Sequence, residues 1–161
     1  MSLWDWAVKV HGSPGMDEAL LELQDDHGQC VSFLLWAAWS AGTGRVLAVG
    51  DMAHAATLAR GWEGDVTAPL RAVRRALKRP RPWVLDTDRE ALRTAVKDSE
   101  LNAERRLLDA LEALSPEVSG GQSGDLGDIA AALQAASAAW MDAAPALTLD
   151  RLAQMVESVA F

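Results

Sequence analysis

The chain has 161 residues, of which 50% are hydrophobic and 24% charged, a composition typical of a globular protein and not of a disordered one. Its formal net charge of −8 disfavours a general affinity for nucleic acid or for anionic membranes. The single cysteine, Cys30, excludes an intramolecular disulfide and a multi-cysteine metal site, and it fits a reducing cytoplasm. The N-terminus lacks the pattern of a signal peptide, and the longest apolar stretch, Phe33 to Trp39, is too short to span a membrane. We therefore expect a cytoplasmic protein without a membrane span.

Helix-forming residues dominate, and no segment shows sustained alternation of β-branched residues, so the sequence predicts an all-α fold. The first helix should begin after Ser2, with Asp5 as its capping partner, and end near His11-Gly12. The second should begin at Ser13-Pro14 and end at His27-Gly28.

The third predicted helix, residues 29–41, is apolar on nearly every side. Such a helix is normally buried all round. We therefore expect an irregular or orthogonal bundle of six to eight helices centred on this segment.

Two more helices are predicted over about 51–60 and 62–79, separated at Gly61. Pro69 should kink the second one or mark its true first turn. The apolar residues of this second helix recur on one face, which we expect to be buried: Val66, Leu70, Val73 and Leu77.

A rigid Pro80-Arg81-Pro82 break precedes the longest predicted helix, which Thr87-x-x-Glu90 should open as a capping box and which should end near Leu114. Its predicted apolar stripe repeats at helical spacing: Leu92, Val96, Ala103, Leu107, Leu111 and Leu114.

The remaining chain differs in composition from the predicted core domain, residues 1–114. Residues 115–127 are rich in glycine and serine, as expected of a linker. Residues 128–161 form an alanine-rich acidic tail, with helices expected over about 129–146 and 149–159. The tail should dock on the core or on a partner, or exchange between two copies.

Three groups of motifs occur in a fixed order between about residues 3 and 114. They are Leu3-Trp4-Asp5 with Pro14-Gly15; Leu23-Gln24-Asp25-x-His27-Gly28 with Leu34-Leu35-x-x-x-Trp39; and Pro69-Leu70-Arg71-x-x-Arg74-Arg75-x-Leu77-Lys78 with Leu92-Arg93 and Glu100-x-x-x-Glu104. Together they resemble an uncharacterised proteobacterial family, a domain of unknown function. The resemblance implies a small, helical, bacterial, cytoplasmic protein without an established activity.

The most distinctive candidate site is a basic stripe. Its members Arg71, Arg74, Arg75 and Lys78 stand at i, i+3, i+4 and i+7, and with Arg81 and Trp83 they form a candidate interaction surface. The stripe favours a non-enzymatic adaptor that binds an acidic protein or a second copy of itself. Alternatively, the stripe is solvated, or is neutralised by acids at 17–26 and by Glu100 and Glu104. Nucleic acid is disfavoured, because aromatic residues do not interleave the stripe.

A second hypothesis is a small-molecule site or an enzyme pocket formed by Asp25, His27 and Glu104. No cofactor or metal is expected, because neighbouring carboxylates such as Asp25 and Asp26 point about 100° apart on a helix. No nucleophile elbow or phosphate loop is present in the sequence, so an enzyme is not the favoured interpretation.

Overall fold

The structure is a computed structural model that describes residues 1–118 and 123–159. Its helices are α1 (Leu3–His11), α2 (Met16–Asp25), α3 (Val31–Gly42), α4 (Val49–Trp62), the π-helical turn η1 (Glu63–Thr67), α5 (Ala68–Ala76), α6 (Asp86–Ala113), α7 (Leu126–Trp140) and α8 (Ala146–Glu157). Because α4, η1 and α5 are continuous, the described residues form seven rods and no strand, which confirms the predicted all-α bundle. Residues 119–122 of the expected linker and 160–161 of the tail lie outside the described residues.

Helix α3 occupies the centre of the bundle and contacts α1, α2, α4, α6, α7 and α8. Ten of its twelve residues are buried, including Phe33, Trp36 and Trp39. The Trp36 indole donates a hydrogen bond to Ser115 Oγ at 2.7 Å, so even its one polar atom is satisfied inside the protein.

The first two helices fix one side of this core. Ser2 caps α1 as predicted, because its hydroxyl accepts a hydrogen bond from the Asp5 amide. The prediction for the start of α2 was two residues early: Gly15, not Ser13, is the N-cap, and its φ of 76° suits glycine. Gly28, with φ 62°, then turns the chain toward α3, and the indole of Trp140 donates to its carbonyl oxygen.

The predicted break at Gly61 is wrong. Helix α4 begins at Val49, two residues earlier than expected, and continues through η1 into α5, where Pro69 lies in the first turn. A π turn holds more residues than an α turn, so the π-helical segment of five residues lets the rod continue but rotates the side chains of α5 about the helix axis relative to those of α4. The Trp62 indole, just before η1, donates to the Ala103 carbonyl oxygen and joins this rod to α6.

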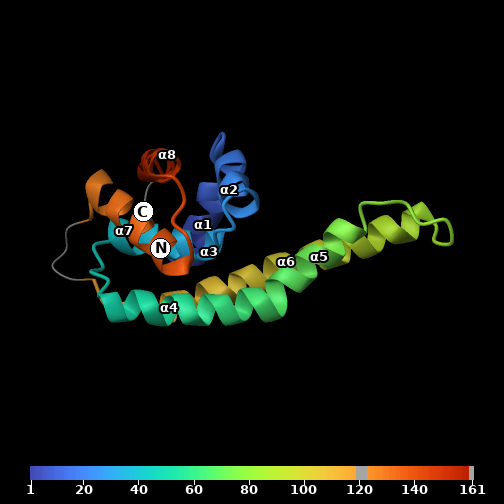
Figure 1. Ribbon diagram of the computed structural model, residues 1–161, viewed down its shortest axis with the longest axis horizontal. Helices are drawn as coiled ribbons and strands as arrows, with labels where there is room; N and C mark the ends of the chain where they lie inside the picture. The colour runs from blue at the N-terminus through green and yellow to red at the C-terminus, as the bar shows by residue number, and fades with distance from the viewer. Residues whose placement is uncertain (119–122, 160–161) are drawn as a thin grey trace.

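Rods α4–η1–α5 and α6 form a long antiparallel hairpin whose outer end extends away from the other helices (Figure 1). The capping box expected at Thr87 and Glu90 is wrong, because α6 begins at Asp86 without a side-chain cap. The predicted apolar stripe is buried only in the second half of α6, at Ala103, Leu107 and Leu111, whereas Leu92 is exposed. Among the helices that the structure describes, none forms a further layer over the outer half of the hairpin against which Leu92 could pack.

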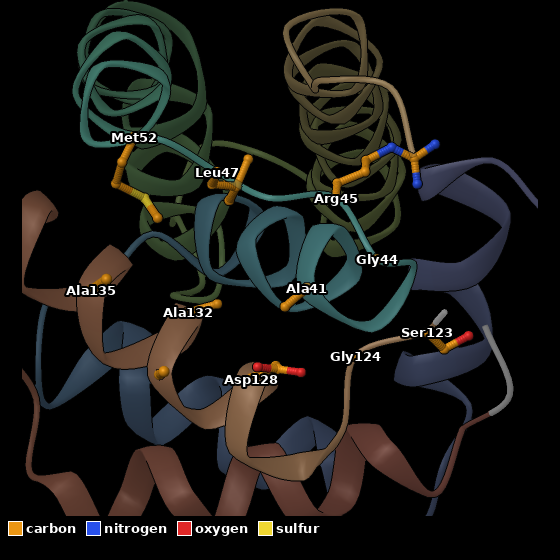
Figure 2. A pocket seen from close by; sticks show the side chains of 11 residues that line it. Ala41, Gly44, Arg45, Leu47, Met52, Ser123, Gly124, Asp128, Ala132 and Ala135 are labelled. Carbon is orange, nitrogen blue, oxygen red and sulfur yellow. The ribbon is translucent and has the colours of Figure 1, made fainter. Parts of the chain in front are cut away.

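Helix α7 packs against α3 and α4, and α8 packs against α2, α3 and α7. One hydrophobic cluster therefore includes side chains from α1 to α4 and α6 as well as from α7 and α8. Gly124, just before α7, lies so close to the Ala41 carbonyl oxygen that a Cβ atom would collide with it (Figure 2). The helix expected to reach 146 ends at Trp140, and Pro145 leads into α8.

Among the described residues, no helix combines the length and the apolar character needed to cross a bilayer.

Candidate interaction surface

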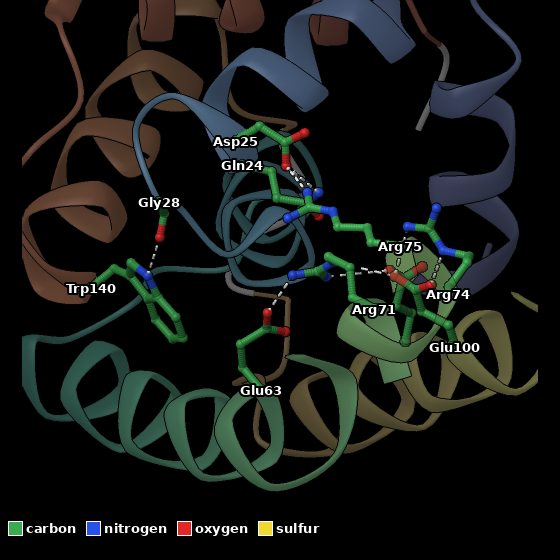
Figure 3. Close-up of polar contacts among 10 residues, drawn as sticks. Gln24, Asp25, Gly28, Glu63, Arg71, Arg74, Arg75, Glu100 and Trp140 are labelled. Carbon is green, nitrogen blue, oxygen red and sulfur yellow. Dashed lines mark hydrogen bonds and ion pairs between the residues drawn. The ribbon is translucent and has the colours of Figure 1, made fainter. Parts of the chain in front are cut away.

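The inner part of the basic stripe faces other helices. Arg71, on α5, donates to Glu63 of η1 at 2.7 Å and to Glu100 of α6 at 3.2 Å (Figure 3). Its side chain is only 13% exposed. Burial by itself would lower the pKa of Arg71, but the charges of Glu63 and Glu100 outweigh burial and raise it.

Arg74, one turn further along α5, donates from Nε and Nη2 to the two carboxylate oxygens of Glu100. This hydrogen bonding is the main reason why the pKa of Arg74 lies above its ordinary value. The Glu100 side chain is 7% exposed, so the Arg71–Glu100–Arg74 cluster is largely removed from water. Such a cluster specifies how α5 and α6 align, because a missing partner would leave a buried charge.

Arg75 lies at the edge of the same face. It donates to Asp25 Oδ1 at 2.6 Å and so joins α5 to the end of α2, although both side chains are about half exposed (Figure 3). The hydrogen bond from Gln24, together with Arg75, lowers the pKa of Asp25.

These contacts correct the expected orientation of α5. Its cationic residues Arg71 and Arg74 are more buried than Val73, which was expected on the buried face and is 48% exposed. Arg71 and Arg74 therefore cannot offer free charges to a partner, and the stripe is neutralised internally along this part. The sequence signal for this arrangement was the acid pair Glu100-x-x-x-Glu104, whereas the π turn that positions Glu63 left no recognisable pattern.

The outer part of the basic segment differs. Beyond the end of α5, Lys78, Arg79 and Arg81 are exposed and form no ion pair with any described residue. Trp83 follows them with 81% of its surface exposed, next to the exposed Leu85. All seven tryptophans are described, and the other six are buried in the core or packed against it. Trp83 is thus a large aromatic side chain without an internal packing role.

The turn that carries Trp83 has a defined conformation. Arg89, which is 7% exposed, donates to the Leu77 carbonyl oxygen and to Asp86, so it holds the end of α5 against the start of α6. Within the turn, the Val84 amide donates to the Arg81 carbonyl oxygen. The exposed cations and Trp83 therefore lie on a turn that these hydrogen bonds tie to α6, residues 77–85, which we call the hairpin end.

The alternative pocket does not assemble as expected. The Asp25 carboxylate forms an ion pair with Arg75, and His27 Nε2 lies 3.9 Å from Glu22 Oε1. Neither Asp25 nor His27 lines either of the two cavities that Glu104 lines. No group of three or more potential metal ligands occurs among the described residues. A pair that the sequence reasoning missed, His11 with Asp17 at 3.2 Å, lies beside Glu104 instead.

The fold and this surface together define a class: an all-helical protein with a central buried helix and a projecting two-helix hairpin. The sequence profile of the family described as "Protein of unknown function (DUF2390)" matches residues 2–111. The chain belongs to this family, which confirms the domain of unknown function predicted over about residues 3–114. No curated protein and no solved structure is significantly similar to it.

Proposed function

We propose that this protein is a non-enzymatic interaction module and that it binds an acidic protein through the hairpin end. The observation that carries the proposal is the 81% exposure of Trp83 beside three exposed cations that form no ion pair with residues 1–118 or 123–159. Exposed tryptophan is costly in water and is enriched among the residues that dominate binding energy at protein interfaces. An acidic partner is favoured because Lys78, Arg79 and Arg81 attract carboxylates around an indole that fills an apolar pocket.

A protein partner accounts for the surface better than nucleic acid does. Trp83 stands among aliphatic neighbours, Val84 and Leu85, whereas sequence-independent nucleic-acid binding uses several aromatic rings along a basic groove. We also propose a cytoplasmic location, since the one cysteine, Cys30, is buried and unpaired, as is usual in a reducing compartment.

The experiment replaces position 83 with a photo-crosslinking amino acid in cells and identifies the adducts by mass spectrometry. A matched control carries the same amino acid at Leu147, which is 82% exposed on α8. We expect a discrete adduct with an acidic protein at position 83 and none at position 147. The purified partner should then lose at least about thirtyfold in affinity on Trp83→Ala, as expected for a central aromatic anchor.

Charge is tested separately with Lys78→Glu, Arg79→Glu and Arg81→Glu in one chain. The matched control reverses three exposed cations elsewhere, Lys9, Arg106 and Arg151. The first set should abolish binding and the second should not. Equal effects of both sets, or adducts that consist of nucleic acid, would contradict the proposal.

A further inference from the structure

Two cavities adjoin between α1, α2 and α6, far along α6 from the hairpin end. The larger one has a volume of about 430 Å³, lies between α1 and α6, and has mainly apolar walls: Trp4, Ala7, Val8, Leu101 and Leu108. The smaller one has a volume of about 240 Å³ and contains the charged residues Asp17, Arg74 and Glu100. His11 and Glu104 line both, so the two spaces meet at these side chains. Their combined size falls within the range of small-molecule sites.

Among the charged groups of this region, Glu104 has the weakest contacts with cationic side chains of the protein. Glu100 is held by Arg71 and Arg74, and Asp17 is paired with His11. Glu104 accepts no hydrogen bond from any described residue, and its nearest cationic atom, Arg71 Nη2, is 3.9 Å away. That guanidinium already donates to two other carboxylates.

The electrostatics agree with this geometry. Two thirds of the Glu104 side chain is covered, and burial, reinforced by the charge of Glu100, raises the pKa of Glu104. The ionised carboxylate is therefore poorly stabilised by the protein itself. A ligand that supplies hydrogen-bond donors and a positive charge would stabilise it.

We propose that the two cavities form one binding site for a small organic cation, a protonated primary amine attached to an alkyl or aryl group. The ammonium group, with its three donors, binds Glu104. The apolar part lies between α1 and α6 against Trp4 and Leu101. Anionic ligands are disfavoured, because the three carboxylates Asp17, Glu100 and Glu104 outnumber the one arginine, Arg74, at the polar end of the cavity.

The test compares three molecules of similar shape by titration calorimetry: 2-phenylethylamine, 2-phenylethanol and 3-phenylpropionate. We expect the amine to bind, the alcohol to bind about tenfold or more weakly because it lacks the charge-assisted hydrogen bond, and the carboxylate not to bind. Amine binding should also shift the NMR signal of the Trp4 indole, assigned with Trp4→Phe. Equal binding of amine and alcohol, or no binding of the amine at millimolar concentration, would overturn the proposal.

Variants locate the site. Glu104→Gln should lower the affinity for the amine about tenfold and leave that for the alcohol unchanged, whereas Asp109→Asn, on the same helix, should alter neither. Val8→Trp, at an exposed position on the wall of the larger cavity, should weaken both ligands. Amine affinity that survives both Glu104→Gln and Val8→Trp would place binding elsewhere and refute the inference. Val8→Trp and the comparison of the three ligands on the unaltered chain test the site without changing any charge of the protein.

Discussion

The two halves of one basic segment have opposite roles. In the inner half, Arg71 and Arg74 are largely buried and hold Glu100 between them. In the outer half, a few residues later, Lys78, Arg79 and Arg81 are exposed and form no ion pair within the part of the chain that the structure describes. The difference follows from position along the hairpin. The inner half reaches Glu100 of α6 and, through Arg75, Asp25 of α2, whereas the outer end extends away from the other helices (Figure 1).

A run of like charges in a sequence therefore need not form one surface. The buried arginines of the inner half act on stability and on helix alignment, because each charge removed from water requires its partner. Exposed cations contribute little to stability and are available for recognition. Substitutions in the inner half should therefore lower the free energy of unfolding, whereas substitutions in the outer half should weaken binding to a partner.

The largest loss in the free energy of unfolding is expected for Glu100→Ala. The substitution leaves Arg71 and Arg74 close together without their shared carboxylate, and breaking a buried pair in this way typically costs about 3–5 kcal/mol. Urea denaturation followed by circular dichroism would measure the free energy of unfolding. The control Asp98→Ala, at an exposed position on α6, should change it by less than about 0.5 kcal/mol. A similar small change for Glu100→Ala would show that the inner cluster does not stabilise the fold.

Glu104→Gln should have an effect that depends on pH. Because folding raises the pKa of Glu104, the folded chain binds a proton more tightly than the unfolded chain. Stability therefore falls as pH rises from the unfolded pKa, about 4.3, through the folded pKa. The variant lacks this loss and should be more stable than the unaltered chain at pH 7, with the advantage vanishing near pH 4. Thermal unfolding across this range measures it, and an advantage that is constant with pH would show that ionisation of Glu104 is not its cause.

The pair Arg75–Asp25 is intermediate in exposure between the inner and the outer half. Its contribution to the free energy of unfolding should be intermediate as well. A double-mutant cycle with Arg75→Ala and Asp25→Ala should give a coupling of about 0.2–1 kcal/mol, because solvent screens a half-exposed pair. The lowered pKa of Asp25 means that its contribution is present above the unfolded pKa and is lost as pH falls through the folded one. The coupling should therefore decline below about pH 4. A coupling that persists in strong acid would require a contact other than the ion pair.

Local sequence patterns were sufficient to predict much of the fold. The apolar run around Trp36 predicted the central helix, and Ser2 predicted the start of α1, because burial and capping act over a few neighbouring residues. Propensity could not predict the join at Gly61, where contacts such as that of Trp62 with α6 keep the rod helical. Likewise, nothing local distinguishes Leu92 from Leu107; only the reach of the hairpin beyond the bundle leaves the former exposed.

The candidate site was predictable in part for the same reason. Spacing placed Arg71, Arg74 and Arg75 on one face, but which face meets α6 depends on the rotation introduced by η1. The pairing of His11 with Asp17 arises from a turn between two short helices, which no periodic pattern encodes. Trp83 was included in the candidate interaction surface because it lies next to the basic segment, but its exposure follows only from the three-dimensional arrangement.

The smallest effect on stability is expected at the hairpin end, where the contrast with the inner half should be clearest. Two changes are compared: Trp83→Ala, and the triple substitution of Lys78, Arg79 and Arg81 by Gln. Each should change the free energy of unfolding by no more than about 0.5 kcal/mol, because Trp83 is 81% exposed and the three cations form no ion pair with a described residue. By contrast Trp36→Ala, in the core, should cost about 3–5 kcal/mol. Denaturation of the three variants alongside the unaltered chain would measure these changes in the free energy of unfolding. A large loss for Trp83→Ala would mean that this indole packs within the protein in solution, and the exposed aromatic anchor on which the proposed interaction rests would not exist.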